Sequence, residues 1–162
     1  MAQSIKAGNL SKGLTYFLIR NRKVIIEIIS ALFILLFLYT SINKTFHIHT
    51  TAIVIGLTSS LDNVSYVVAW SIVVSEYLVS ILLLIPKTRR YGLLGSLILM
   101  LGFTVYIGLM LMTKSSLPCS CGGVISKLSW KQHLIFNIFF TFLAFVGVWL
   151  EMKSKKLIAR MN

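Results

Sequence analysis

Four long apolar runs, separated by charged or turn-forming residues, constrain the fold of this chain more than any other feature. The runs cover residues 24–42, 64–85, 91–112 and 132–150. A helix rises about 1.5 Å per residue, so about 20 apolar residues are needed to cross the hydrocarbon core of a bilayer. Because lipid cannot satisfy the backbone groups of loops or open strands, each run is predicted to be a transmembrane helix. The expected fold is therefore an all-α integral membrane protein built as a bundle of four transmembrane helices.

The composition agrees with a lipid environment. Hydrophobic residues make up 57% of the 162 residues, and the mean hydropathy is +0.87. Soluble domains contain roughly 45–50% apolar residues. The length leaves room for one compact unit, so residues 1–162 are expected to form a single membrane domain. The first 23 residues are too polar for a signal-peptide core, and the first apolar run is expected to remain as an uncleaved anchor.

The formal charge of +12 is unevenly distributed along the chain. Of the 16 Lys and Arg residues, 12 lie in the arm 1–23, the link between the second and third runs, and the segment after the fourth run. Positive charge in short loops marks the cytoplasmic side, so both termini are predicted to be cytoplasmic. A soluble nucleic-acid-binding protein would not alternate its charges with helix boundaries in this way. The other four basic residues are assigned to the outer side: Lys44, Lys114, Lys127 and Lys131.

Two further polar features have simple structural interpretations. The first outer segment, 43–63, is partly apolar and is predicted to contain a short helix in the membrane interface, with His47 and His49 solvated there. Glu27 lies near the cytoplasmic end of the first run, where it can reach water or pair with Arg22 or Lys23.

Glu76 lies near the middle of the second run. A carboxylate at mid-membrane costs about 2.5–3.5 kcal/mol on insertion scales, so Glu76 is expected to face the bundle and find a partner, or to be protonated. Two interpretations remain open: a structural hydrogen bond between helices, or a proton or quinone site.

The link between the second and third runs spans only residues 86–90, which predicts that these helices are antiparallel neighbours. Gly92 and Ser96 then form a small-xxx-small pair, which allows another backbone to approach closely. This pair predicts tight packing between helices and implies no catalytic or binding role.

The only two cysteines, Cys119 and Cys121, stand one residue apart in the outer segment after the third run. Pro118 stiffens one flank, while Gly122 and Gly123 permit unusual backbone conformations on the other. A disulfide across one intervening residue is geometrically tight, and strained or exposed disulfides are the labile or catalytic kind. The motif therefore favours thiol–disulfide exchange, with metal binding and an inert structural loop as the alternatives.

Three residues at helical spacing follow the cysteines: Trp130, His133 and Asn137. Trp130 suits the membrane interface, whereas His133 and Asn137 are expected to face the bundle. The latter two are either satisfied hydrogen-bonding residues, or part of a site in which His133 exchanges protons with a thiol or a bound quinone. In that second case the candidate quinone-binding residues are Asn137, Trp130 and Glu76, although no cofactor is certain. The start of this helix is predicted directly after Ser129, which forms a capping box with Gln132.

A soft metal site competes for the same side chains. A site of soft ligands that suits Cu(I) could be formed by Cys119, Cys121 and His133, with Met110 or Met112. There is no second cysteine pair and no clustered Cys/His spacing of the zinc type, so no metal ligand is assigned.

Residues 118–137, Pro-Cys-Ser-Cys-Gly-Gly-Val-Ile-Ser-Lys-Leu-Ser-Trp-Lys-Gln-His-Leu-Ile-Phe-Asn, resemble the signature of MauE-type membrane proteins in the wider DoxX-like group. The resemblance continues upstream at residues 39–44, Tyr-Thr-Ser-Ile-Asn-Lys, and at Glu76 followed by residues 86–89, Pro-Lys-Thr-Arg. It spans nearly all of residues 24–150.

The resemblance implies a redox-associated four-helix protein of the bacterial cytoplasmic membrane, named for methylamine utilisation. Such a protein assists maturation of a disulfide-rich periplasmic dehydrogenase subunit alongside a thioredoxin-like partner. Carried over to this chain, Cys119 and Cys121 become the exchange pair, and Glu76, His133 and Asn137 are motif positions.

The expected function is therefore thiol–disulfide exchange at the periplasmic face, with Cys119 and Cys121 as the reacting pair and His133 managing protons for a periplasmic client. The rival is a non-enzymatic assembly scaffold or a Cu(I)-handling protein. Solute transport is less favoured because the sequence shows no repeats or broken helices.

Overall fold

The computed structural model describes residues 21–59, 64–113 and 130–158. Within these ranges the chain is all-helical. Four helices are long and apolar enough to cross a membrane, which confirms the predicted class and number of spanning helices. Three of these four extend past the apolar runs into polar flanks. The helices are α2 (Arg22–Phe46), α3 (Ile48–Ser59), α4 (Ser65–Leu84), α5 (Arg89–Thr113) and α6 (Trp130–Ile158).

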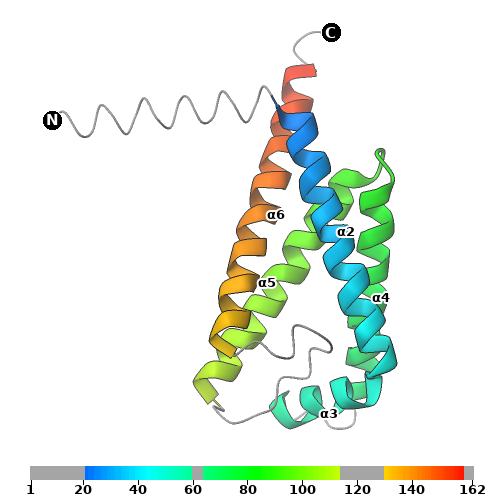
Figure 1. Cartoon of the computed structure of the whole chain (residues 1–162), viewed down its shortest axis with the longest axis vertical. Helices are drawn as coiled ribbons and strands as arrows, with labels where there is room; N and C mark the ends of the chain where they lie inside the picture. The colour runs from blue at the N-terminus through cyan, green and yellow to red at the C-terminus, as the bar shows by residue number, and fades with distance from the viewer. Residues whose placement is uncertain (1–20, 60–63, 114–129, 159–162) are drawn as a thin grey trace, which may run out of the picture.

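The four long helices form a ring in which each helix packs against two neighbours (Figure 1). α2 lies between α4 and α6, and α5 closes the ring by packing against α4 and α6. The start of α2, the last turns of α6 and the turn between α4 and α5 lie at one end of the bundle, which we call the turn end. The short helix α3 lies across the opposite end, which we call the α3 end.

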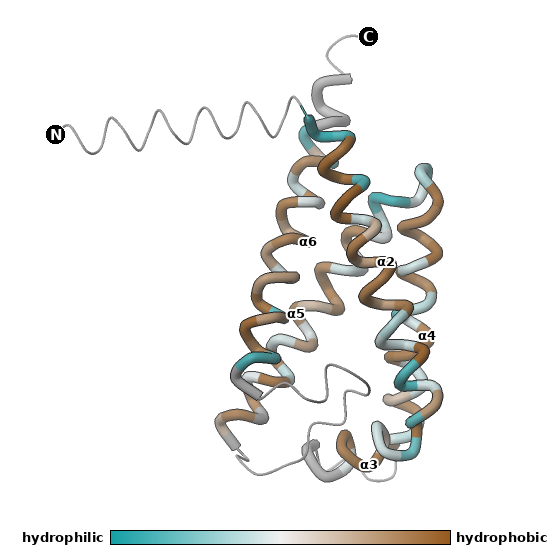
Figure 2. The backbone as a smooth tube through the Cα atoms, viewed as in Figure 1, coloured by the Kyte–Doolittle hydropathy of each residue, from teal (hydrophilic) through white to brown (hydrophobic). Residues whose placement is uncertain are grey.

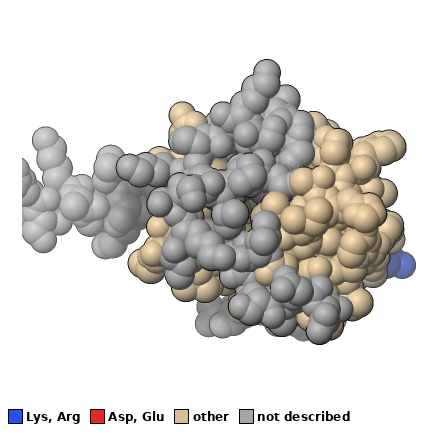
Figure 3. Space-filling view, turned by 90° about the horizontal axis from the view of Figure 1, so that it is seen from below, with Lys and Arg blue, Asp and Glu red and all other residues tan. Residues whose placement is uncertain are grey.

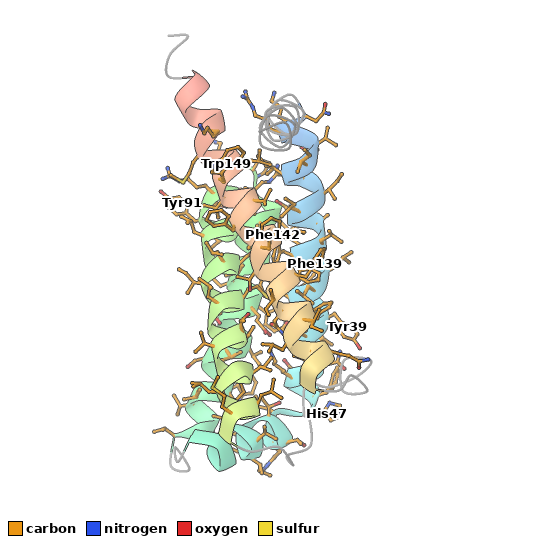
Figure 4. The ribbon with its side chains drawn as sticks, turned by 90° about the vertical axis from the view of Figure 1, so that its left-hand side faces the viewer. Tyr39, His47, Tyr91, Phe139, Phe142 and Trp149 are labelled. Carbon is orange, nitrogen blue, oxygen red and sulfur yellow. The ribbon has the colours of Figure 1, made fainter. Side chains whose placement is uncertain are left out.

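The outer surface of the bundle is apolar. Figure 2 shows hydrophobic residues along the lengths of the long helices and hydrophilic residues mainly near their ends. Leu35 and Ile98 are 68% and 69% exposed, which would be costly in water but suits contact with lipid tails. Phe139 and Phe142 likewise point outward from α6 (Figure 4). The chain is therefore a multi-pass membrane protein.

Polar aromatic side chains and charges mark the two ends of the bundle. Tyr91 and Trp149 lie toward the turn end, and Tyr39 lies toward the α3 end (Figure 4). Such aromatic residues favour the two membrane interfaces. Figure 3, viewed from the α3 end, shows almost entirely uncharged side chains among the described residues. This distribution agrees with the charge bias of the sequence; the cytoplasmic location of both termini stays a prediction.

The core of the bundle is dominated by aromatic and branched side chains from α2 and α6. Phe33 and Phe37 of α2 are buried, and their ring centroids lie 5.6 Å apart. Phe140 of α6 meets Phe33 edge to face, also at 5.6 Å. Ring pairs in this geometry contribute about 0.5–1.5 kcal/mol beyond the area they bury, so they help to hold α2 against α6.

Small residues bring α4 and α5 into close contact near the turn end. A Cβ atom on Gly92 would lie 2.8 Å from the backbone nitrogen of Leu83, and one on Gly95 would lie 2.7 Å from a Val79 methyl group. Ser96 is buried, and its Oγ donates a hydrogen bond to the Gly92 carbonyl oxygen at 2.8 Å. The predicted antiparallel hairpin and its close approach at Gly92 are confirmed; the second close contact is at Gly95, while Ser96 is buried and bonded within its own helix.

The predicted short helix in the first outer segment is also confirmed, as α3. Ala52 and Ile55 of α3 pack with Ala69 of α4. The His49 ring meets the Tyr66 ring edge to face, with centroids 5.2 Å apart. His47 is exposed between α2 and α3 (Figure 4). These contacts hold α3 across the end of the bundle.

Glu27 finds a different partner from those suggested by the sequence. Its Oε1 lies 3.8 Å from a guanidinium nitrogen of Arg89, at the start of α5. The Glu27 side chain is 65% exposed, so it also reaches solvent. Arg22 and Lys23 were expected because they are neighbours in sequence, but the bundle brings α5 to this face of α2.

Candidate functional site

A buried ion pair joins α2 to α4. Glu76 lies past the midpoint of α4, and its side chain is completely buried. Lys44 of α2 donates a hydrogen bond from Nζ to Oε1 of Glu76. A carboxylate within the membrane needs such a partner because lipid offers it no solvation. Of the two outcomes expected for Glu76, a partner or protonation, the structure shows the partner.

Lys44 points into the bundle. A lysine near the end of a membrane helix ordinarily extends toward the interface, where its ammonium group is solvated. Here the Lys44 side chain is only 13% exposed, and Nζ lies 4.7 Å from the centroid of the Phe103 ring of α5. The ion pair is therefore supplemented by a cation–π contact to a third helix.

The placement of Lys44 in the outer segment 43–63 beyond the first helix was wrong, whereas its assignment to the outer side of the membrane stays a prediction. The residue lies in the last turns of α2, and its charge is directed to Glu76. One sequence signal pointed to it: a mid-membrane carboxylate requires a cation, and Lys44 is one of the basic residues near the outer helix ends, with Lys114 and Lys131. The sequence does not single out Lys44 among these three, since 32 residues separate it from Glu76.

The carboxylate of Glu76 is only partly satisfied. Oε1 accepts the hydrogen bond from Lys44, and the Thr40 side chain interacts with the carboxylate, whereas Oε2 has no well-formed hydrogen bond in the described part of the chain. On the same helix, Ser80 Oγ donates to the Glu76 carbonyl oxygen at 2.8 Å, so it does not serve the side chain. Buried carboxylate oxygens normally accept hydrogen bonds, so Oε2 is available to a ligand.

His133 and Asn137 occupy the first turns of α6 and face inward, as the sequence suggested. They are 7% and 4% exposed. Asn137 Nδ2 donates to the His133 carbonyl oxygen at 2.9 Å, and Thr141 Oγ1 donates to the Asn137 carbonyl oxygen at 2.8 Å. Thr141 Oγ1 also lies 3.1 Å from Thr104 Oγ1 of α5, which joins the polar side of α6 to its neighbour.

His133 and Asn137 face the same cavity as the ion pair, a space of about 510 Å³ in the half of the bundle nearer α3. Binding sites for small molecules commonly measure about 300–1,000 Å³ and combine apolar walls with a few convergent polar groups. The walls of this cavity are mostly apolar and come from all five helices. Its principal polar and charged side chains are Lys44, Glu76, His133 and Asn137.

The cavity follows from the path of α5. This helix is held against α4 at Gly92 and Gly95 and then runs obliquely toward α6 (Figure 1). Away from the glycines, the space between α4 and α5 is lined by Ile72 and Gly102, among others. Thr51 and Ile55 of α3 line it from the end of the bundle. One end of the bundle is therefore tightly packed, and the other contains the cavity.

Several residues proposed from the sequence lie outside the described residues. These are Cys119, Cys121 and the side chain of Trp130, and their site roles stay predictions. The helix start expected after Ser129 agrees with α6, which begins at Trp130.

The Cu(I) alternative also involves Met110 and Met112. The Met110 side chain is not among the described side chains. Met112 is 87% exposed, whereas His133 is buried. The described residues contain no group of three or more His, Cys, Asp or Glu side chains that could hold a metal ion.

Comparison with known families gives one match. The family model described as methylamine utilisation protein MauE matches residues 22–150. The matched region covers most of the chain, including every residue that lines the cavity and the Cys119–Cys121 motif. No curated protein and no solved structure matches the chain significantly.

Proposed function

We propose that this chain, which belongs to the MauE family of methylamine utilisation proteins, exchanges disulfides with a client protein at the periplasmic face of the bacterial inner membrane. Membership of the family and four spanning helices make it a multi-pass membrane protein associated with methylamine utilisation. The exchange pair is Cys119 and Cys121, and the client is a protein whose maturation requires disulfide bonds, assisted by a thioredoxin-like partner.

One observation carries the proposal. His133 follows the cysteines closely in sequence and faces the cavity that also contains the buried Lys44–Glu76 pair. A helix that serves only to anchor a loop has no need of buried polar groups, which are rare in membrane segments and typically functional. His133 is the side chain best suited to exchange protons near neutral pH, which thiol chemistry requires.

The exchange is a two-electron transfer between dithiols. In the oxidising direction, a thiolate of the client attacks the Cys119–Cys121 disulfide, the S–S bond breaks, and a mixed disulfide forms. The second client thiolate then displaces the cysteine of this chain. The client gains a disulfide, and Cys119 and Cys121 become thiols that carry the two protons released by the client. In our proposal His133 relays these protons.

Single cysteine variants test the proposal. Cys119→Ser and Cys121→Ser each leave one thiol without its neighbour, so at least one variant is expected to accumulate a mixed disulfide with the client. The adduct should be visible on a non-reducing gel, disappear on reduction, and be absent from the double variant. Disulfide formation in the client should fall in all three variants, while Ser120→Ala serves as the matched control and retains it.

A scaffold role predicts the opposite result. If client disulfides form normally in both single variants, and the variants insert at wild-type levels, the cysteines do not cycle and the exchange proposal is wrong. Assembly or Cu(I) handling would then account better for the chain.

A further inference from the structure

We infer that the cavity binds the head group of a lipid-soluble quinone and of its quinol form. The choice of a redox ligand rests on the proposed exchange function, whereas the binding site itself consists only of described residues of the bundle. Four properties of the cavity favour this ligand: its shape, its hydrogen-bonding groups, its access to lipid and its charge.

The cavity walls suit a flat apolar ring. Phe37, Phe103 and Phe136 contribute aromatic side chains from three different helices, and Leu99 and Ile72 add aliphatic surface. The volume of about 510 Å³ can hold a substituted ring with the first part of an isoprenoid tail. Aromatic rings pack favourably against another ring in offset or edge-to-face geometry.

The polar groups match both oxidation states of such a ring. Nζ of Lys44 has three N–H donors, and one is used by Glu76 Oε1. Oε2 of Glu76 is a buried acceptor without a well-formed hydrogen bond among the described residues: the Thr40 side chain interacts with the carboxylate, but its hydroxyl donates to the Phe37 carbonyl oxygen at 3.2 Å. A quinone carbonyl accepts a hydrogen bond, and a quinol hydroxyl donates one. A donor and an unfilled acceptor on one ion pair can therefore bind the same ligand oxygen before and after reduction.

The cavity is accessible from the lipid-facing side of α5. Ile98 and Gly102 line the cavity and are also exposed on the bundle surface, with Ile98 69% exposed. They therefore lie at its rim. The rim is apolar and belongs to a spanning helix, so the ligand would enter from the bilayer. This route selects a lipid-soluble molecule.

The charge of the site disfavours an anionic lipid or a fatty acid. The one ammonium group in the cavity wall of known placement, that of Lys44, is already paired with Glu76. A carboxylate or phosphate ligand would lie beside the Glu76 carboxylate, and like charges at such a distance repel strongly. A neutral ligand with carbonyl or hydroxyl oxygens avoids this repulsion.

Quinone binding would complete the proposed exchange. After oxidation of the client, Cys119 and Cys121 carry two thiol protons and two electrons more than in the disulfide. Their reoxidation to a disulfide transfers two electrons and two protons to a quinone, which becomes a quinol. A membrane-borne acceptor of this class can leave the site through the bilayer.

Two glycines of α5 provide a matched test. A Cβ on Gly102 or on Gly108 would have no atom within 4 Å, so both positions have open space where an added side chain begins. Only Gly102 lines the cavity. Gly102→Leu should therefore fill part of the cavity, and Gly108→Leu should not.

The experiment uses the full chain in lipid nanodiscs, with an azido-benzoquinone photoprobe and decylubiquinone as competitor. Labelled peptides are mapped by mass spectrometry. We expect competed labelling in α2 and in the 98–107 segment of α5, a loss of at least about tenfold in Gly102→Leu, and wild-type labelling in Gly108→Leu.

A second variant tests the polar groups. Lys44→Met/Glu76→Gln removes both charges together, so no uncompensated charge is left in the bundle. Its labelling should fall by about tenfold, as expected for the loss of a charge-assisted hydrogen bond. Equal labelling of the two glycine variants, or labelling that decylubiquinone does not compete, would overturn the inference. Competition by a phosphatidylglycerol or fatty acid in place of the quinone would also overturn it.

The binding test is independent of the cysteines. In the Cys119→Ser/Cys121→Ser variant, photolabelling should be unchanged. Labelling without cysteine cycling would contradict the exchange proposal alone, and cysteine cycling without labelling would contradict quinone binding alone.

Discussion

The two ends of the bundle each contain an ion pair, but they differ in how closely α4 and α5 pack and in how deeply the ion pair is buried. Near the turn end, glycines bring α4 and α5 into backbone contact, and the Glu27–Arg89 ion pair is long, with the Glu27 side chain 65% exposed and the Arg89 side chain 21% exposed. Toward the α3 end, α5 leaves α4, a cavity opens, and the Lys44–Glu76 ion pair is buried against it.

We infer from this difference that the turn end serves the stability of the bundle and the α3 end serves binding. Close packing without buried charge is the economical way to hold membrane helices together, since lipid provides no hydrophobic force between them. A buried charge pair beside an unfilled cavity stabilises a membrane bundle poorly. We therefore propose that the α3 half is the functional half of the bundle.

The largest effect is expected from breaking the buried ion pair. Lys44→Met leaves the Glu76 carboxylate in the bundle without a cation, which should destabilise the fold by about 3 kcal/mol. Unfolding of the purified protein by SDS, followed by circular dichroism, measures this loss. Adding Glu76→Gln removes the uncompensated charge and should restore most of the stability. A double variant no more stable than Lys44→Met would show that the pair is not coupled as the structure indicates.

A smaller loss of stability is expected when the close packing of α4 and α5 at the turn end is disturbed. Gly92→Ala places a methyl group 2.8 Å from the Leu83 backbone nitrogen, so α4 and α5 must move apart. Overpacking of this kind typically costs about 1–3 kcal/mol. Gly108→Ala, on the same helix with no atom within 4 Å of its added methyl group, is the matched control. Equal stability of the two variants in SDS unfolding would mean that the helices do not approach closely here.

The polar contact between α5 and α6 should contribute less to the stability of the bundle than the close packing at Gly92. Thr104 Oγ1 and Thr141 Oγ1 lie 3.1 Å apart, and each is also within hydrogen-bond distance of a backbone carbonyl of its own helix. Each hydroxyl has a single hydrogen, so the interhelical bond forms only when one of the two shares or gives up its bond to the backbone. Interhelical hydrogen bonds in membranes average about 0.6 kcal/mol. A double-mutant cycle with Thr104→Val and Thr141→Val should give a coupling energy near this value. A coupling above about 2 kcal/mol would move this contact into the same class as the buried ion pair.

The smallest effect is expected for the ion pair at the turn end. Glu27 is 65% exposed and lies 3.8 Å from Arg89. Exposed pairs contribute about 0–1 kcal/mol, so Glu27→Gln should change stability by less than about 0.5 kcal/mol. A loss comparable to that of Lys44→Met would remove the contrast between the two ends.

Features that depend on local composition were predictable from the sequence. Apolar length predicts the four spanning helices, and the short link with Gly92 and Ser96 predicts the tight antiparallel hairpin of α4 and α5. Burial of His133 and Asn137 followed from their spacing and from the cost of polar groups in lipid. In each case the physical cause lies within a few residues of the feature.

Features that depend on the relative placement of helices were not predictable. Lys44 was assigned to an outer loop because basic residues at helix ends usually face water, and only the fold shows that α2 continues through it and meets Glu76. The cavity has no sequence signature, since it arises from the oblique path of α5.

The central claim is that Cys119 and Cys121 cycle between dithiol and disulfide. The most direct measurement is their redox state in intact membranes, by differential alkylation and mass spectrometry across a series of buffered thiol potentials. We predict reversible cycling with a midpoint well above about −300 mV, the level below which structural disulfides resist reduction. Thiols that never oxidise, or a disulfide that never reduces, would contradict the claim.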